Sequence, residues 1–271
     1  MRVLLDTGIF IHAEFATNAV KRTTIRWGGT DQISEVHGLK RKPPSQDFDY
    51  QSQKDALFTV GRLIREGRIE AFEYWEIECE KFRGTPTIKE FNALRDCVIH
   101  KCDPAIQRSR FRKSINLTDV FSKGGKKDIK NGISLGQANQ IAFLEWLVSL
   151  TPSQVNCISS NGRTIGLPQF EIDSFTDIGW FKRLCNRSGS RENYPDVFHL
   201  WTAKRNELDT LLTLENTLPK LVDRIKSEKS GRIRIGVDVF RPLDLLKKLG
   251  IDKPDPVPLE INRFYHLHEL P

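Results

Sequence analysis

The chain has 271 residues, enough for one large domain or two small ones with hydrophobic cores of their own. Apolar residues make up 38% and charged residues 28%, and no apolar run approaches the roughly 20 residues that span a bilayer, so we expect no membrane partner. Lys and Arg (42) outnumber Asp and Glu (35) by 7, and the five cysteines show no paired spacing, which predicts a reducing, cytoplasmic location.

The first predicted element is a short buried strand at residues 2–5, which ends at Asp6. A turn follows the strand, and the apolar pattern of residues 9–15 predicts a short helix. Residues 20–49 are polar and contain a Gly-Gly and a Pro-Pro pair, so we predict a loop there.

Helix and strand alternate in the next segment. Apolar residues at helical spacing predict a helix from 50 to 67, and the residues that favour strands predict a strand over 68–75. Residues 76–84 are then predicted to be helical, which would place Glu76 and Glu80 on one face, one turn apart.

Residues 84–190 carry weaker patterns. Residues 87–101 and 136–150 are predicted to be helices, residues 155–160 a strand, and residues 177–186 a short helix.

A basic stretch lies within this part of the chain, at residues 101–130. It holds nine basic and three acidic residues, a net charge of +6 that nearly equals the surplus of the whole chain. Concentrated positive charge suits a polyanion such as RNA, although a solvated loop or helix face is the alternative. Phe111 and Phe121 would stack on bases or pack in the core. The candidate nucleic-acid contacts are Arg108, Arg110, Arg112, Lys113, Lys123, Lys126 and Lys127.

The closing part again alternates helix and strand. Helices are predicted at 195–207, 217–227 and 242–250, strands at 210–214 and 232–240, and an irregular Pro-rich tail follows. This alternation predicts an α/β fold with a mostly parallel sheet covered by helices on both faces. The carboxyl ends of its strands should meet at one edge, where ligands bind in such sheets.

Three acids stand at the junctions that reach this edge. Asp6 ends the first strand, Asp196 begins a helix, and Glu215 follows the strand at 210–214. Carboxylate oxygens are the ligands that hard divalent cations prefer, so acids that meet at this edge predict a metal site. Each acid has a structural alternative, because such residues also cap helices or face solvent.

Two motifs resemble the family of PIN-domain nucleases. The opening "VLLDTGIFI" is similar to the first strand and turn of that family, and "PDVFHLWTAKRNELDTLLTLE" is similar to its closing helix and strand. The resemblance covers residues 1–83 and 191–250. It implies a three-layer α/β/α fold with a mostly parallel central sheet, formed as one domain over 1–250. Residues 84–190 would be a helical, basic insertion, and residues 251–271 a Pro-rich C-terminal tail.

The resemblance also implies a site that binds one or two Mg²⁺ or Mn²⁺ ions. Thr7 and Thr213 match hydroxyls that orient such a site, while His199 and Asn206 lie on the same helical stripe as Asp196. Glu76 is a second choice for the middle acid. Two positions depart from the family pattern, because Gly8 stands where Asn or Ser is frequent and Glu215 where Asp is usual. The four acids expected to bind the metal and carry catalysis are Asp6, Glu80, Asp196 and Glu215.

The function expected from the resemblance is a metal-dependent endoribonuclease that hydrolyses phosphodiester bonds of single-stranded or structured RNA. Members of the family also serve as toxins or defence effectors. The resemblance therefore leaves open whether the chain binds an inhibitory or regulatory protein partner and whether it forms a homo-oligomer. Two alternatives remain: a catalytically silent RNA-binding or scaffold module, which the departures at Gly8 and Glu215 motivate, and a metal-dependent DNA nuclease.

Overall fold

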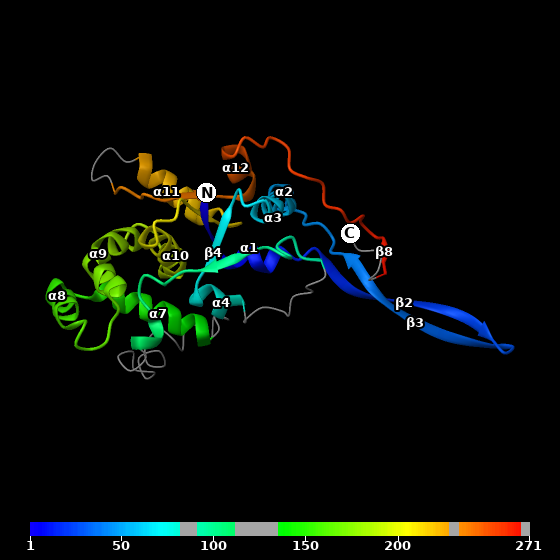
Figure 1. Ribbon diagram of the computed structural model, residues 1–271, viewed down its shortest axis with the longest axis horizontal. Coiled ribbons are helices and arrows are strands. Elements are labelled where there is room, and N and C mark those ends of the chain that lie inside the picture. Colours follow the sequence, from blue (N-terminus) through cyan, green and yellow to red (C-terminus); the bar gives the residue numbers. More distant parts are fainter. Residues whose placement is uncertain (82–90, 112–134, 228–232, 267–271) are drawn as a thin grey trace. The chain divides into compact units, whose positions relative to one another are not determined.

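A computed structural model describes residues 1–81, 91–111, 135–227 and 233–266. The chain divides into two compact units (Figure 1). Unit 1 comprises residues 1–100, 212–215 and 240–271, and unit 2 comprises residues 101–211 and 216–239. These bounds differ from the expected core and insertion, because the helices predicted at 195–207 and 217–227 belong to unit 2.

A five-stranded parallel sheet with flanking helices confirms the predicted α/β class and the mostly parallel sheet. The strand order is β5-β4-β1-β6-β7, and β1 pairs in parallel with β4 from Arg2 opposite Glu70 to Leu4 opposite Phe72. Val3, Leu4 and Leu5 are fully buried, as a central strand requires. The strands are β1 (Arg2–Leu5), β4 (Glu70–Glu73), β5 (Ile99–Lys101), β6 (Thr210–Leu212) and β7 (Asp238–Phe240).

The helices of unit 1 lie near predicted ones, but the single helix predicted from 50 to 67 is two helices, at 48–55 and 57–65. Within the unit, α1 packs against α4, and α12 packs against both α2 and α3. Gly67 adopts a positive φ of 71° just after α3, where the predicted left-handed cap was expected to end the helix. The helices are α1 (Thr7–His12), α2 (Phe48–Asp55), α3 (Leu57–Arg65), α4 (Trp75–Lys81) and α12 (Pro242–Lys248).

A long β-hairpin occupies residues 16–41, so the loop prediction for residues 20–49 is wrong over most of its length. Strand β2 (Ala16–Trp27) pairs antiparallel with β3 (Thr30–Arg41) through twelve residue pairs and projects from the helices of unit 1 (Figure 1). Gly28 and Gly29 form the two-residue turn with φ values of 60° and 83°, both in the left-handed region that such turns require. Most of its residues are exposed on both faces, so the alternation that marks a half-buried strand is missing.

The tail returns to this hairpin instead of remaining irregular throughout. Strand β8 (Phe264–Tyr265) pairs antiparallel with Leu39 and Lys40 of β3, which makes a three-stranded sheet at the base of the hairpin. Gly38 permits this approach, because a Cβ there would lie 2.4 Å from both the Phe264 ring and the Tyr265 carbonyl oxygen.

We therefore expect Gly38→Ala to separate β8 from β3, since the Tyr265 carbonyl is a backbone group and can avoid the added Cβ only if the strand moves. Amide hydrogen exchange at residues 264–265 should become at least about tenfold faster, while exchange in β1 stays unchanged. Ser34→Ala in the same strand is the matched control and should leave both regions as they are. Unchanged protection at 264–265 in Gly38→Ala would contradict the close approach.

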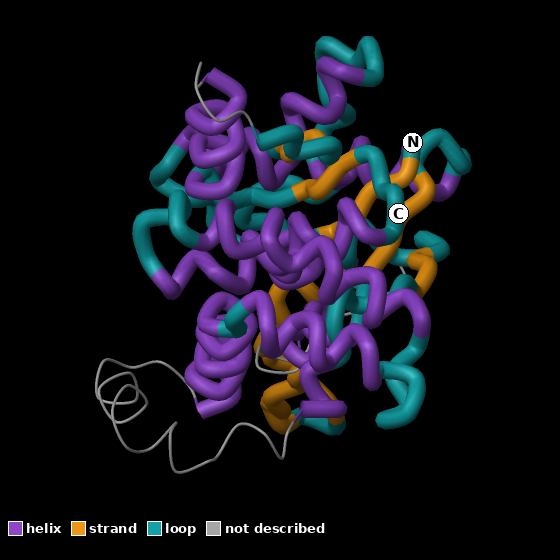
Figure 2. The backbone as a smooth tube through the Cα atoms, turned by 90° about the vertical axis from the view of Figure 1, so that its left-hand side faces the viewer, coloured by secondary structure: helices purple, strands orange, loops and turns teal. Residues whose placement is uncertain are grey.

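Unit 2 is mainly helical, and Figure 2 shows helices as the most frequent element of the described chain. Helix α10 packs against α7 and α9, and α8 packs against α9. Buried aromatic rings fill the spaces between them; those of Phe181 and Trp201 are stacked, with centroids 4.9 Å apart. The α-helices described in this unit are α7 (Leu135–Ser149), α8 (Pro152–Asn161), α9 (Gln169–Cys185), α10 (Tyr194–Arg205) and α11 (Thr217–Ser227).

Three further sequence predictions require correction. Residues 155–160, predicted as a strand, lie in α8, where the side chains of Thr151 and Gln154 form a capping box before the helix. The described part of the predicted helix 87–101 is irregular and ends in β5, with Asp96 at a positive φ of 58°. Of the strand predicted at 232–240, the last three residues form β7, and residues 233–237 are not in a strand.

None of the described helices has both the length and the apolar character needed to cross a bilayer.

Candidate functional site

Asp6 lies where β1 passes into α1, and its carboxylate binds two neighbours. Its Oδ1 accepts a hydrogen bond from the Thr7 backbone N–H at 2.8 Å, which caps the helix. Its Oδ2 accepts a hydrogen bond from the Thr213 hydroxyl at 2.8 Å. The Asp6 backbone N–H also donates to the carbonyl of Leu212 at 3.0 Å, which joins the end of β1 to the end of β6. The ends of β1 and β6 therefore meet at one edge of the sheet, and the role of Asp6 and Thr213 in a metal site stays a prediction.

Thr213 connects two of the predicted positions. Its buried hydroxyl donates to Asp6 and accepts the backbone N–H of Glu215 at 3.1 Å. The residue thereby fixes the Asp6 carboxylate and the turn on which Glu215 stands. The Glu215 side chain is exposed, so this acid lies at the solvent side of the strand end.

The middle acid is brought to the site by α4. The Thr7 hydroxyl donates a hydrogen bond to Oε2 of Glu80, so Thr7 stands between the carboxylates of Asp6 and Glu80. Glu76, one turn earlier in α4, is almost completely buried at 3% exposure. The geometry therefore links Glu80, the first choice from the sequence, to Thr7 and so to Asp6.

Gly8 leaves space beside this carboxylate. A Cβ at position 8 would lie 3.6 Å from Asp6 Oδ2, which is ordinary contact, so the site accommodates a small side chain. Glycine has no side-chain donor of its own, and the hydroxyls of Thr213 and Thr7 donate to Asp6 and Glu80, respectively.

Two further side chains of unit 1 border this region and were not singled out from the sequence. The His12 ring lies edge-on to the Tyr50 ring, with centroids 5.6 Å apart. Burial lowers the pKa of His12, and the cations Lys54 and Lys42 lower it further, so its imidazole is neutral at pH 7. Burial raises the pKa of Tyr50, and the charge of Glu215 adds to the effect. His12 and Tyr50 lie far apart in the sequence, in different predicted helices, so no sequence pattern indicated this contact.

The remaining predicted site residues belong to unit 2, where α10 carries or adjoins them. Asp196 is half-buried in the first turn of the helix, and His199 is buried at 2% exposure. Asn206 ends the helix, and its side-chain amide donates to the carbonyls of Asp103 at 2.7 Å and Thr202 at 2.9 Å. These contacts give Asn206 a structural role in unit 2. That Asp196 shares a metal with Asp6 stays a prediction.

The basic stretch is described only at its beginning. Arg108 donates to the side-chain oxygen of Asn139 at 2.7 Å, and Arg110 forms an ion pair with the buried Glu171 at 2.9 Å. Phe111 is buried against the rings of Phe143, Trp146 and Phe175, so it packs in the core. The other candidate contacts, Arg112, Lys113, Phe121, Lys123, Lys126 and Lys127, lie outside the described residues.

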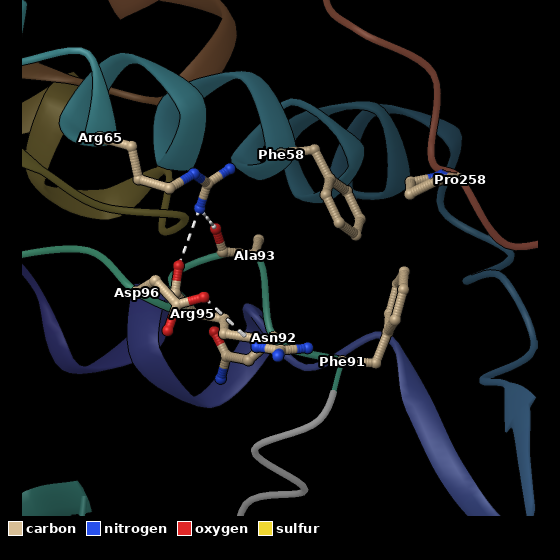
Figure 3. Close-up of a pocket in the computed structure, with 8 residues that line it drawn as sticks. All are labelled: Phe58, Arg65, Phe91, Asn92, Ala93, Arg95, Asp96 and Pro258. Carbon is tan, nitrogen blue, oxygen red and sulfur yellow. Dashed lines mark hydrogen bonds and ion pairs between the residues drawn. The ribbon is translucent and has the colours of Figure 1, made fainter. Parts of the chain in front are cut away.

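A separate cavity of about 380 Å³ lies in unit 1, and its lining includes none of the predicted acids (Figure 3). Phe58, Phe91 and Pro258 form its apolar side, and the ring centroids of the two phenylalanines are 5.7 Å apart. The Arg65 guanidinium at its wall donates to the carbonyls of Ala93 at 3.2 Å and Arg95 at 2.9 Å. This arginine is thus engaged in holding the segment before β5.

The donor chemistry of the Asp6 region suits Mg²⁺ or Mn²⁺. Among the described residues, no group of three or more His, Cys, Asp and Glu side chains is close enough to hold a metal ion. Mg²⁺ commonly uses one or two carboxylates and completes its shell with waters and substrate phosphates. Asp6 and Glu80 carry carboxylate oxygens of this chemical type, and each accepts a hydrogen bond from Thr7.

No protein-family model, no curated protein and no solved structure matches this chain.

Proposed function

We propose that the chain is a metal-dependent endoribonuclease with a PIN-like fold. One observation carries the proposal: Thr213 holds the Asp6 carboxylate at the carboxyl ends of adjacent strands, and Thr7 joins it to Glu80. Ligands of open parallel sheets bind at this edge. A hydroxyl that positions a carboxylate from a neighbouring strand is the arrangement that a cation site needs, because it fixes the ligand before the ion arrives.

The proposed site contains residues that would bind the metal and residues that would position them. Asp6 and Glu80 would hold Mg²⁺ or Mn²⁺, with Asp196 and Glu215 completing the proposed set. A bound divalent cation supplies an activated water and stabilises negative charge on the departing oxygen. Thr213 would keep the Asp6 carboxylate in one orientation, and Thr7 would do the same for Glu80. Without a cation, carboxylates gathered at one place would repel one another.

RNA is the proposed substrate because the chain is basic. Its net charge is +7, and most of the surplus lies at residues 101–130. Binding of such residues to phosphates releases counterions from the RNA. Because this release gains less free energy at high salt concentration, the phosphate contacts weaken as salt is added. Cleavage at subsaturating RNA should therefore slow as the salt concentration rises.

The proposal predicts cleavage of single-stranded RNA by the purified chain with Mn²⁺ or Mg²⁺, and none with EDTA. Labelled RNA and DNA strands of the same sequence are compared on denaturing gels, and we expect DNA cleavage at least about tenfold slower. An Asp6→Asn/Asp196→Asn double variant, prepared in the same way, controls for a contaminating nuclease.

Retention of RNA without cleavage at any metal concentration would support the silent binding module instead. A preference for the DNA strand would support the DNA nuclease.

A further inference from the structure

The hairpin at residues 16–41 is an unusually exposed element for one of this length. Its twelve-residue strands receive a third strand only at their base, where β8 pairs with β3. Trp27 and Ile33 are 74% and 73% exposed, and Val20 and Ile25 are about half exposed. A two-stranded hairpin alone is marginally stable in water, so large apolar side chains on its surface indicate a binding role.

The pairing register separates the hairpin into two faces of different character. Directly paired residues share a face, and the face that carries Arg22 and Arg26 also carries both acids of the hairpin. Arg22 pairs with Glu35 at 2.8 Å, and Arg26 lies 4.0 Å from Asp31. The cations at these two positions on this face are therefore matched by acids.

The opposite face has no acidic residue within residues 16–41, all of which the structure describes. It carries the exposed Trp27 beside the turn, with Ile25 next to it and Lys21 and Lys40 farther along. We call this the Lys–Trp face; it comprises residues 17, 19, 21, 23, 25 and 27 of β2 and 30, 32, 34, 36, 38 and 40 of β3.

We propose that the Lys–Trp face binds a segment of single-stranded RNA, which rests on the proposed function and names the surface that would hold its substrate. A base would stack on the Trp27 indole, and phosphates would contact Lys21 and Lys40. Stacking on exposed aromatic rings beside basic residues is the general way in which proteins bind single strands without reading a sequence.

The dimensions of the face suit a strand of several nucleotides. Trp27 lies six positions after Lys21, a distance of about 20 Å at the rise of a strand. About six stacked nucleotides would span this distance. Lys40 pairs opposite Thr17, so the face offers a second cation about 13 Å beyond Lys21.

Charge favours RNA over a second copy of the chain as the occupant. The hairpin carries five cationic and two acidic residues, and both acids lie on the other face. Two Lys–Trp faces brought together would oppose like charges with no acid between them, whereas a phosphate backbone neutralises the lysines.

The hairpin also follows Asp6 closely in the sequence and belongs to the same unit. Asp6 caps α1, α1 ends at His12, and β2 starts at Ala16 in the same unit. The base of the hairpin is held by backbone hydrogen bonds, from Lys42 N–H to the Phe15 carbonyl and from Ala93 N–H to the Ala13 carbonyl, both at 2.8 Å. An RNA strand on this face would thus be bound by the unit that carries Asp6 and Glu80.

The test measures binding of a labelled RNA of about 12 nucleotides by fluorescence anisotropy in EDTA, so that cleavage does not interfere. Trp27→Ala should raise Kd about tenfold, and Trp27→Phe should recover part of that loss because a ring remains. Ile33→Ala, equally exposed on the other face, is the matched control and should stay within about twofold. Lys21→Ala/Lys40→Ala should lower the slope of log Kd against log salt by about 1.4.

Unchanged affinity in Trp27→Ala and in the double lysine variant would overturn this inference, whether or not the chain cleaves RNA. Weaker RNA binding by these variants in a chain that never cleaves would uphold it and remove the nuclease proposal instead. Sedimentation velocity tests the other occupant: a dimer that Trp27→Ala dissociates, with RNA affinity unchanged, would assign the face to a second copy and overturn the inference.

Discussion

Asp6→Asn is expected to reduce metal-dependent RNA cleavage by about 10²-fold or more while leaving the fold intact. The amide removes a negative charge from the proposed cation site. It keeps an oxygen that can accept the Thr7 N–H, and Asn caps helices about as well as Asp. Initial rates at saturating Mn²⁺ measure the loss, and thermal unfolding should shift by less than about 2 °C.

Two substitutions of Thr213 test the same site more gradually than Asp6→Asn does. Thr213→Ser keeps the hydroxyl that donates to Asp6 and should retain most activity, whereas Thr213→Val keeps the shape and removes that donor. We expect about a tenfold loss with Val, because the carboxylate is no longer held in one orientation. Full activity in Asp6→Asn would remove Asp6 from the mechanism and, with it, the proposed site.

Gly61→Ala is expected to destabilise unit 1 by about 3 kcal/mol, which lowers its unfolding temperature by about 10 °C. Gly61 lies in α3, and a Cβ there would stand 1.9 Å from the carbonyl oxygen of Ala93 and 2.9 Å from its carbon. Backbone atoms cannot rotate away as a flexible side chain would. The helix or the segment around Ala93 must therefore move. The Ala93 N–H also donates a hydrogen bond to the carbonyl of Ala13, at the end of α1, so this contact would be disturbed as well.

Gly8→Ala is the matched control for this prediction, since it also adds one methyl group to a helix of unit 1. Its Cβ would meet its nearest atom, Asp6 Oδ2, at 3.6 Å, and Ala favours helix over Gly by up to about 1 kcal/mol. Chemical denaturation followed by circular dichroism compares the two variants. Equal stability of Gly61→Ala and the unmodified chain would mean that α3 and residue 93 are farther apart than the structure has them.

Several elements of the fold could be predicted from the sequence because local and tertiary preferences agree. The strand before Asp6 is apolar throughout, as a central parallel strand must be, and the helix of residues 194–205 begins with a proline in its first turn. The approach of the ends of β1 and β6, where Asp6 contacts Thr213, is what parallel strands whose ends share one edge require.

Other elements were missed for identifiable reasons. The hairpin buries little, so its residues carry no apolar pattern, and the Gly28–Gly29 pair that forms its turn also suits an ordinary loop. Residues 155–160 include β-branched side chains that favour a strand, but the capping box at Thr151 and Gln154 begins a helix before them. His12 and Tyr50 meet only through tertiary packing, which no local pattern reports.

The hydrogen bond between Thr213 and Asp6 joins residues 207 positions apart. A ribosome adding about 5–20 residues per second would release the first strand long before its partner hydroxyl. Nascent or truncated chains that end before residue 213 would thus carry Asp6 without the group that orients it. The oriented state of this carboxylate would therefore arise only after residue 213 has been added and the end of β6 has joined the end of β1.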